Sequence, residues 1–568
     1  MSKARDIADS TKTLDVDGGT IKLDGNYPVG TNNVALGNLA LGGSLSGSNN
    51  VAIGHATLDF NTSGSSNTGV GYASLTDNST GSDNTGVGEF SLANNSSGIN
   101  NTAIGSNTLQ SNTTASNNTA VGYQAGYSNT TGEYSTMVGW AAGYANTTGS
   151  IEAFGAGALD ANTTGTLNAA FGRSALTSNT TGNNNVAIGY ASLLLNTTAS
   201  NNTAVGYQAA YSNTTGTSNT ALGQGSLYSN SVGTDNTSIG QATLYNNTAS
   251  DNTALGVSAL NGNTTGTHNI GVGRRPLLSN TSGSYNVAMG TDALRSNTTA
   301  SNNTAVGYNA GYSKTTGNNN TFVGMSAGYS ATTSAANTFV GRNDNGFGAG
   351  YYVTTGAKNT IIGGYDGNQG GLDIRTSSNN IVLSDGDGNP RVHVDSSGNV
   401  LVGTTDTSPA SNDVAGSLRS STGLVQASVS GNPCLFVNRK TNDGDAVSIR
   451  RAGSQVGSIS VTGSSTAYNT SSDYRLKENV VYDWDATTRL KQLKPARFNF
   501  ITDADTTVDG FLAHEAQAVV PECATGTHNE VDDDGAAVMQ GIDQSKLVPL
   551  LVKTIQELEA RITALEGA

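Results

Sequence analysis

The segment NTAVGYQAGYSNTTGEY (residues 118–134) contains the unit from which more than half of this chain is built. It returns with small changes as NTAIGSNTLQSNTTASN (101–117) and NTAVGYQAAYSNTTGTS (202–218). The unit is 17 residues long and reads N-T/V-A-h-G-x-x-A/S-L-x-x-N-T-T-G-x-x, where h is an apolar residue. A fixed period of this length indicates a solenoid, in which each repeat forms one coil that stacks on the next.

One glycine marks each repeat, and the residue before it, the pre-glycine residue, is always Val, Ile, Leu, Met or Phe. Successive marker glycines are 17 residues apart except for two steps of 16, from 139 to 155 and from 240 to 256. Leu often stands four residues after the glycine, as in Leu58, and Tyr stands five after it in the A-G-Y variants, as in Tyr127. The 19 marker glycines are Gly37, Gly54, Gly71, Gly88, Gly105, Gly122, Gly139, Gly155, Gly172, Gly189, Gly206, Gly223, Gly240, Gly256, Gly273, Gly290, Gly307, Gly324 and Gly341.

The apolar stretch in each repeat is too short for a helix and suits a short β-strand, and N-T-T-G is typical of a turn. Stacked coils align like residues into apolar and Asn/Thr ladders, and at about 4.8 Å per strand 19 coils would span roughly 90 Å. We therefore expect a mainly β fold with an elongated β-solenoid over residues 32–341. Because the pre-glycine residue is apolar in every repeat, we expect it to face inward.

Composition excludes several functions. The net charge of −15 disfavours nucleic acid and anionic membranes as partners, since both attract clustered Lys and Arg. Two cysteines, Cys434 and Cys523, form neither a disulfide framework nor a metal site, and no cofactor is expected. No apolar run is long enough for a membrane span or a secretory signal, so we expect synthesis in a cytoplasm and no membrane insertion.

The 17-residue period ends after Gly341, and the composition of the sequence changes. Residues 342–379 are Gly-rich and irregular, and 379–405 alternate apolar and polar residues around D-G and S-G-N turns, which predicts antiparallel hairpins. Residues 406–470 indicate further short strands. From Ser472 onward 26 of 97 residues are charged, against 15 of 310 in the repeats, so a separate α/β-type domain is expected.

Four motifs follow one another in this last region. They are S-D-Y-R-L-K (472–477), LKPARFNF (493–500), GFLAHEAQAVVPE (510–522) and GIDQSKLVPLLVKTIQELEARI (541–562). In this order they resemble the endosialidase-type intramolecular chaperone, a self-cleaving serine–lysine peptidase domain at the C-terminus of bacteriophage tail fibres and tailspikes. The resemblance covers about residues 466–568.

The resemblance implies which residues do the chemistry. Ser472 matches the nucleophile, Lys477 the general base, and the cleaved bond is Ser471–Ser472. His514 is a candidate for support of folding or cleavage. The chemistry requires a neutral lysine, which burial produces by disfavouring the charged form.

The end of the chain carries a heptad pattern. Its apolar residues alternate steps of three and four, as the seam of a coiled coil does. A helix of three heptads is marginal alone, so we expect a trimeric bundle; the alternative is an amphipathic helix packed on its own domain. The predicted seam consists of Val548, Leu551, Ile555, Leu558, Ile562 and Leu565.

The repeats resemble the head repeats of trimeric autotransporter adhesins, although the period there is usually 14. Together the two resemblances imply a homotrimeric tail fibre of the virion. Its expected parts are a virion attachment segment (1–31), the solenoid shaft (32–341), a β-rich receptor-binding region (342–470) and the chaperone and autoprotease domain (471–568). Expected partners are other virion tail proteins and a host cell-surface receptor, most simply a glycan.

Two other functions stay open at this point. A tailspike that degrades polysaccharide needs a pair of carboxylates in a cleft, for which 342–470 leave room. An ice-binding solenoid with Thr ladders would explain the repeats but not the C-terminal motifs. A stripe that includes Tyr123, Tyr207 and Tyr308 is a candidate sugar-binding surface, with packing as the alternative.

Overall fold

The computed structural model describes residues 31–43, 46–406, 416–419, 425–428, 435, 437, 439, 442–532 and 535–568. Within it the chain divides into two compact units, Met1–Leu435 and Phe436–Ala568. Residues 1–30 of the predicted attachment segment and Cys434 lie outside the described residues.

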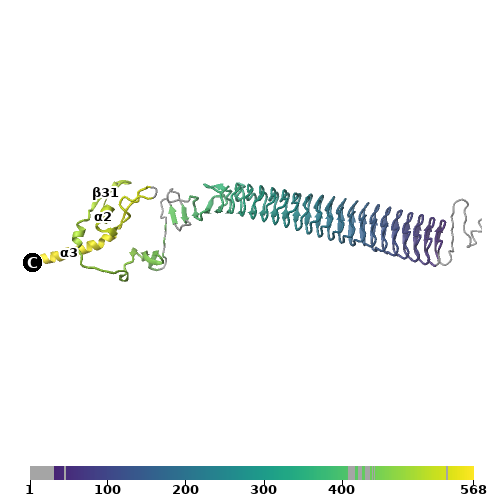
Figure 1. Cartoon of the computed structure of the whole chain (residues 1–568), viewed down its shortest axis with the longest axis horizontal. Coiled ribbons are helices and arrows are strands. Elements are labelled where there is room, and N and C mark those ends of the chain that lie inside the picture. The colour runs from purple at the N-terminus through teal and green to yellow at the C-terminus, as the bar shows by residue number, and fades with distance from the viewer. Residues whose placement is uncertain are drawn as a thin grey trace, which may run out of the picture. The chain divides into compact units, whose positions relative to one another are not determined.

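Each of the 19 repeats contributes one short strand, and these strands stack with a further one, β20, as a parallel ladder (Figure 1). Neighbouring strands pair in register, so that Ala204 lies beside Ala221 and Val205 beside Leu222. The predicted mainly β fold with a solenoid is therefore confirmed. The strands are β1 (Val34–Leu36), β2 (Val51–Ile53), β3 (Thr68–Val70), β4 (Thr85–Val87), β5 (Thr102–Ile104), β6 (Thr119–Val121), β7 (Thr136–Val138), β8 (Ile151–Phe154), β9 (Asn168–Phe171), β10 (Val186–Ile188), β11 (Thr203–Val205), β12 (Thr220–Leu222), β13 (Thr237–Ile239), β14 (Thr253–Leu255), β15 (Ile270–Val272), β16 (Val287–Met289), β17 (Thr304–Val306), β18 (Thr321–Val323), β19 (Thr338–Val340) and β20 (Thr360–Ile362).

The marker glycine turns the chain out of each strand. At Gly206 the backbone φ is 139°, a value that L-residues rarely adopt, and a Cβ built there would lie 2.6 Å from the carbonyl oxygen of Gly223 in the next coil. Backbone conformation and close stacking therefore both require glycine at this corner.

The core is a narrow column of small and medium side chains. The middle residue of each strand, such as Ala204, is fully buried, and so is the leucine four residues after the marker glycine, such as Leu193. Leu193 has a left-handed backbone with φ 49°, which costs an L-residue about 1–2 kcal/mol. Full burial of a leucine contributes about 1.5–3 kcal/mol, so the strained position is stable once coils stack.

Large core residues occur where the leucine position holds glycine. Met137 packs between Gly126 and Gly143, and Phe322 packs beside Gly311 and Gly328. In the A-G-Y variants of the repeat, glycine takes the place of the buried leucine, and a nearby strand holds a larger side chain at its centre. The leucine column and the strand-centre column of the core thus exchange size.

A buried ladder of asparagines runs along the N-T-T-G turns. Each Nδ2 donates to the Oδ1 of the asparagine in the preceding coil, for example Asn179 to Asn162 at 2.8 Å, and to a carbonyl of its own turn. The side chains form two runs, from Asn61 to Asn230 and from Asn247 to Asn297. The gap falls at the second 16-residue step, and Oδ1 of Asn230 and of Asn297 is buried without a hydrogen-bond partner.

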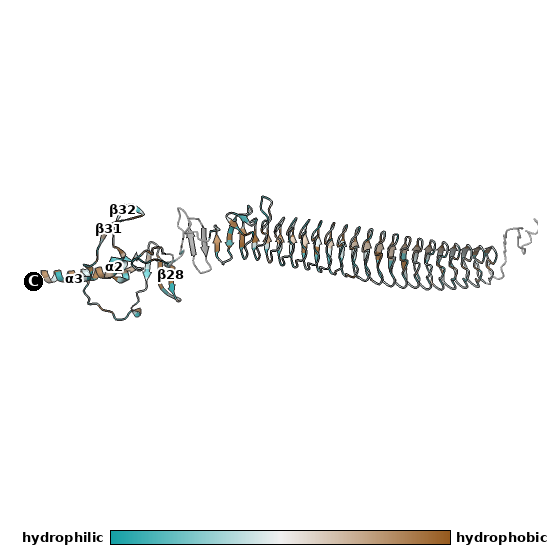
Figure 2. Ribbon diagram, turned by 45° about the horizontal axis from the view of Figure 1, so that its top comes forward, coloured by the Kyte–Doolittle hydropathy of each residue, from teal (hydrophilic) through white to brown (hydrophobic). Residues whose placement is uncertain are grey.

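The expectation that pre-glycine residues face inward is wrong for the single chain. Side chains alternate along a strand, so when Ala204 points into the coil its neighbours Thr203 and Val205 point outward. None of the 19 pre-glycine residues is buried, and Leu222, for example, is 45% exposed. The solenoid therefore carries an apolar column on its outer surface, and Figure 2 shows apolar residues recurring on the strands from coil to coil.

The parallel ladder continues beyond Gly341. β20 pairs in parallel with β19, and β23 (Ile381–Ser384) pairs in parallel with β20. The intervening turns are longer than in the repeats and include the short hairpin of β21 (Asn368–Gln369) and β22 (Leu372–Asp373). The solenoid thus extends past the predicted boundary because strand stacking tolerates longer turns.

Antiparallel hairpins then end the ladder, as predicted for 379–405. β23 pairs with β24 (Pro390–Val394), which pairs with β25 (Val400–Val402). β26 (Gly416–Arg419) and β27 (Val425–Ser428) extend the sheet. The first unit therefore changes from parallel to antiparallel pairing within one continuous sheet.

The second unit begins with a three-stranded antiparallel sheet of β28 (Gly444–Arg451), β29 (Ser454–Val461) and β30 (Thr466–Thr470). Smaller hairpins follow, β31 (Ala496–Phe500) with β32 (Asp503–Gly510), and β33 (Ala524–Thr525) with β34 (Gly541–Ile542). The helices are η1 (Tyr474–Leu476), α1 (Ala486–Leu490), α2 (Ala513–Val519), η2 (Pro521–Cys523), η3 (Gln544–Leu547) and α3 (Val548–Glu566).

A small core joins these helices. Ala486, Ala516, Val520, Cys523, Leu547 and Leu550 are buried together. No helix of the described residues is long and apolar enough to cross a membrane.

Candidate functional site: a serine–lysine pair after an edge strand

The predicted cleavage bond follows the edge strand β30. This strand pairs with β29 along its whole length, from Gly457 opposite Thr470 to Val461 opposite Thr466. The pairing continues one step further, because the backbone N–H of Ser471 donates to the carbonyl of Val456 at 3.2 Å. The sheet therefore fixes the chain up to Ser471, the residue that contributes the predicted scissile carbonyl.

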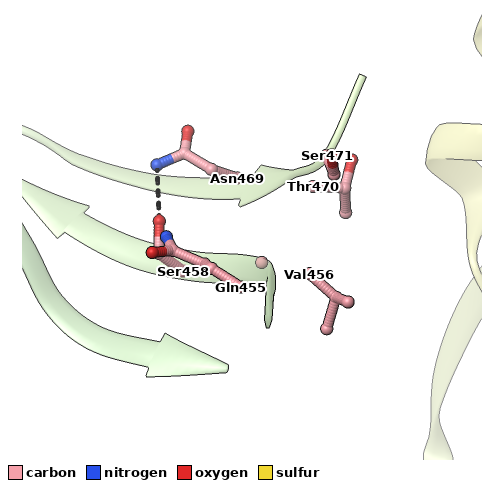
Figure 3. Close-up of a pocket in the computed structure, with 7 residues that line it drawn as sticks. Gln455, Val456, Ser458, Asn469, Thr470 and Ser471 are labelled. Atoms are coloured by element: carbon pink, nitrogen blue, oxygen red, sulfur yellow. Dashed lines mark hydrogen bonds between the residues drawn. The ribbon is translucent and has the colours of Figure 1, made fainter. Parts of the chain in front are cut away.

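A surface pocket of about 270 Å³ lies against the end of this strand (Figure 3). Its walls are amide, hydroxyl and backbone groups of β29 and β30, and Asn469 Nδ2 donates to Ser458 Oγ at 3.2 Å. The residues that line it are Gln455, Val456, Gly457, Ser458, Asn469, Thr470 and Ser471.

The short helix η1 brings the predicted nucleophile and base together. Asp473 caps the turn by accepting from Arg475 N, and Lys477 N donates to the carbonyl of Tyr474 at 3.0 Å. This reversal of the chain places Lys477 Nζ 2.7 Å from Ser472 Oγ, to which it donates a hydrogen bond. The two residues separated by five positions are thus in direct contact.

Asp473 and Arg475 support the same turn. The guanidinium donates from Nε to Oδ1 at 2.9 Å and from Nη2 to Oδ2 at 2.7 Å, a bidentate ion pair. These side-chain hydrogen bonds from Arg475 lower the pKa of the Asp473 carboxyl. The pair keeps the turn closed and leaves Lys477 as the basic group next to Ser472.

His514 lies elsewhere in the described structure. It occupies the first turn of α2, where its ring meets the ring of His528 edge to face at a centroid distance of 4.2 Å. No described hydrogen bond or ring contact joins it to Ser472 or Lys477. The structure of one chain therefore brings two of the three predicted site residues together.

Ser472 and Lys477 are both exposed in the single chain. Large apolar side chains beside them are exposed as well, with Tyr474 81% and Leu476 73% accessible. The burial that the lysine chemistry requires is thus not supplied by this chain alone. Among the described residues, no group of three or more His, Cys, Asp or Glu side chains is placed to hold a metal ion.

Helix α3 uses a face that the heptad pattern did not identify to pack on its own unit. Leu550 and Thr554 are buried, and Glu557 one turn later accepts from the backbone N–H groups of Ala486 and Thr487 at 2.8 and 2.7 Å. Its carboxylate therefore stabilises the N-terminus of α1, where unpaired N–H groups favour negative charge. Sequence analysis missed this role of Glu557, because nothing in the local pattern shows which helix end it meets.

The residues of the predicted seam lie on a different face of α3, which is exposed. All six seam residues are exposed, from 43% for Leu558 to 78% for Leu565. The helix does pack on its own unit, as the alternative expected, but through Leu550 and Thr554 and not through this seam.

Residues 472–525 match the family model described as the chaperone of endosialidase. The match begins at Ser472 and ends in β33, so it includes the serine–lysine pair and α2 and leaves the solenoid outside. No curated protein and no solved structure matches the chain.

Proposed function

We propose that the chain is the shaft of a homotrimeric bacteriophage tail fibre, carried on the virion, that attaches to a host cell surface. Its C-terminal region acts as an intramolecular chaperone that aligns three chains and is then cut off before Ser472. The observation that carries the proposal is that one chain contains a long β-solenoid and, nearer its C-terminus, a match to the endosialidase chaperone.

The exposed seam of α3 supports assembly into trimers. A helix with one face packed on its own unit and a second apolar face in solvent is incomplete as a monomer. Three copies would bury Leu551, Ile555 and Leu558 against each other in the manner of a coiled coil. A non-repetitive unit of this kind sets a unique register.

The apolar column on the outer surface of the solenoid supports trimer formation along the shaft as well. Pre-glycine residues from Leu36 to Val340 are half-buried or exposed, and the strand residue two positions earlier is usually Thr. Three solenoids that meet on this face would remove the column from water without changing the core of any coil. Because the repeat offers many slipped pairings of similar energy, the chaperone must set the alignment first.

The serine–lysine pair supports self-cleavage. In the proposed step neutral Lys477 accepts the proton of Ser472 Oγ, which attacks the carbonyl carbon of Ser471. The Ser471–Ser472 C–N bond breaks, the lysine returns the proton to the new amino group of Ser472, and an ester joins Ser471 to Ser472 Oγ. Water then hydrolyses this ester and leaves a carboxylate on Ser471 and a free hydroxyl on Ser472.

Assembly would supply the neutral lysine. Lys477, Tyr474 and Leu476 are exposed in one chain. Contact with a second copy would remove water from the ammonium group, and desolvation lowers the pKa of a lysine. Cleavage would then follow trimerisation and not precede it.

Deletion of residues 472–568 tests the chaperone role. The full-length gene is expected to yield soluble trimer by light scattering and rod-shaped particles by electron microscopy, and the truncated gene aggregated or misregistered chains. Soluble trimer of the correct length from the truncated gene would contradict the proposal. Adsorption of the purified wild-type fibre to susceptible host cells tests the adhesive role independently.

A further inference from the structure

Four of the five basic residues of the repeats lie in one part of the solenoid. Residues 32–172 contain no Lys or Arg, and the next hundred contain only Arg173. Arg274, Arg275, Arg295 and Lys314 then follow within three coils. Lys314 is buried in the core, so the three arginines make the surface charge of this part of the chain.

Two of the three arginines, Arg275 and Arg295, share one acidic partner across neighbouring coils, and Arg274 precedes Arg275 in the chain. Arg275 Nη2 donates to Asp292 Oδ2 at 2.8 Å, and Arg295 Nε lies 3.4 Å from Asp292 Oδ1. Arg274 is exposed, and its side chain has no hydrogen-bond or ion-pair partner among the described residues. Two guanidinium groups at one carboxylate, with Arg274 next to one of them in the sequence, leave this set of residues, the arginine cluster, with a surplus of positive charge.

The cluster is not a satisfied structural network. Buried polar atoms without a hydrogen-bond partner gather here: Arg275 Nε, Arg295 Nε, Asp292 Oδ1 and Asn309 Oδ1. Arg295 Nε and Asp292 Oδ1 face each other as an ion pair, whereas Arg275 Nε and Asn309 Oδ1 have no hydrogen-bond partner among the described residues, and an unpaired buried polar group is costly. The side chains of Arg275 and Arg295 are also each 31% exposed, so part of each remains open to solvent.

An aromatic column extends the cluster along the fibre axis. The guanidinium of Arg295 lies over the ring of Tyr312, 5.4 Å from its centroid, and donates to its hydroxyl. Tyr312 stacks on Tyr329 at 5.0 Å, and Tyr329 stacks on Tyr351 at 4.8 Å. The rings hold Arg295 in place and present a row of hydroxyl groups beside the positive charge.

We infer that Arg274, Arg275 and Arg295, with the hydroxyls of the Tyr312 column, bind the anionic groups of an acidic polysaccharide. Guanidinium groups match carboxylate and phosphate or sulfate oxygens in planar, bidentate hydrogen bonds. Anionic groups repeat along such a polymer as the arginines and hydroxyls repeat along the coils. The inference rests on the proposed adhesive function and names the class of glycan for it.

The residues of the site are different from those of the column proposed for trimer contact. They stand one, two and five positions after marker glycines, whereas the trimer face carries pre-glycine residues. Three copies of the arginine cluster would therefore be displayed around the trimer, and repeated weak contacts with one polymer would add to the avidity of the fibre.

Binding of the full-length trimer to three polysaccharides tests the inference. The probes are alginate, which carries carboxylates, dextran sulfate, which carries sulfate esters, and neutral dextran. We expect alginate or dextran sulfate to bind at least tenfold more tightly than dextran of the same length, and less tightly as salt rises. Equal binding of all three would overturn the inference.

Arginine substitutions locate the site. Arg274→Gln alone, at an exposed side chain without a partner, should weaken anionic binding at least threefold, and Arg274→Gln with Arg295→Gln at least tenfold. Arg173→Gln is the matched control, because Arg173 also lies over a tyrosine ring but in isolation, and it should change binding less than twofold. Trimer mass and thermal stability should be those of wild type for Arg274→Gln.

Unchanged binding in Arg274→Gln, or an equal loss in Arg173→Gln, would overturn the inference. Host cells separate it from the adhesive function on which it rests. If wild-type fibre fails to adsorb to susceptible cells, the adhesive function is wrong. If it adsorbs but neither alginate nor dextran sulfate competes and the double variant adsorbs equally, only the polysaccharide inference is wrong.

Discussion

The ring of Phe322 occupies the space that a side chain at Gly328 would need. A Cβ built on Gly328 falls 2.5 Å from both Cδ1 and Cε1 of that ring. The backbone itself is not the obstacle, because Gly328 has φ 63° and leucines at equivalent positions, such as Leu294, have φ 48°. The repeat therefore keeps core volume constant by exchanging size between two columns.

Gly328→Leu should destabilise the shaft by about 1–3 kcal/mol, because overpacking forces the ring or the backbone to move. Adding Phe322→Ala should recover most of the loss, since the pair then has the composition of an ordinary repeat. Thermal unfolding of the two single variants and the double variant measures the coupling. Additive losses would contradict the size exchange.

Ala204 and Val205 are neighbours with opposite roles. Ala204→Asp places an unpaired charge in the core of one coil and should prevent stable folding of the shaft. Val205→Asp places the charge on the outer column, so each solenoid should still form while the trimer weakens. Circular dichroism and light scattering of both variants separate the two effects. A monomeric shaft from Ala204→Asp and unchanged trimer from Val205→Asp would refute this assignment.

Ile555→Asp in α3 should abolish trimer formation, because three carboxylates would meet in the centre of the proposed helical bundle. Gln556→Asp, an exposed change on the same helix, is the control and should leave the trimer intact. Light scattering of the expressed full-length chains gives the mass. A trimer that survives Ile555→Asp would place the subunit contacts elsewhere.

Ser472→Ala and Lys477→Met should each leave a full-length chain that still trimerises, since the contact between the two side chains is not part of any core. Wild type should release residues 472–568, visible on a denaturing gel. Ser465→Ala, in the turn before β30, leaves nucleophile and base untouched and should be cleaved as wild type. An uncut wild-type chain after complete folding would rule out self-cleavage.

Lys314 should make the stability of the shaft depend on pH. It replaces an asparagine of the buried ladder, and desolvation lowers its pKa from 10.5 to about 7. Between these values the folded state keeps the lysine neutral while the unfolded chain still binds a proton, so stability rises with pH across this window. Below it both states are protonated, and the full cost, on the order of a few kcal/mol, remains.

Lys314→Asn should therefore raise thermal stability at pH 7. The difference in thermal stability between this variant and wild type should become smaller as the pH rises towards 10. Unfolding curves at both pH values measure the difference. An equal gain at pH 7 and pH 10 would show that the lysine is not the titrating group. A control at the surface, Lys358→Gln, should show no such pH dependence.

The solenoid was predictable because its 17-residue period can be read directly from the sequence. The face of the pre-glycine residue was not, because an apolar residue is equally constant in a core and in a contact between chains. The decisive signal was the residue before it: Ala, Gly or Ser stands there in 16 of the 19 repeats, which indicates a coil interior with little room for larger side chains. The same reasoning explains why β20, separated from β19 by longer turns, escaped a search for period 17.

The candidate site also has a part that the sequence predicts and a part that it does not. Ser472 and Lys477 stand five residues apart, and one short turn is enough to join them. The meeting of Glu557 with the start of α1 connects residues about 70 positions apart, and no local pattern encodes it. The surroundings of the serine–lysine pair and of His514 depend on contacts that the proposed assembly would add.

The buried asparagine amides of the turns all have the same orientation along the solenoid. Every Nδ2 from Asn78 to Asn230 donates towards the N-terminal neighbour, so all the carbonyl groups of that run face the opposite way. Reversing a single amide would set oxygen against oxygen on one side and hydrogen against hydrogen on the other. The run can reverse only as a whole, which makes it a rigid chain of aligned dipoles whose two ends are electrically unlike. A solenoid built on such a column has a built-in polarity from one end to the other, independent of its charged residues.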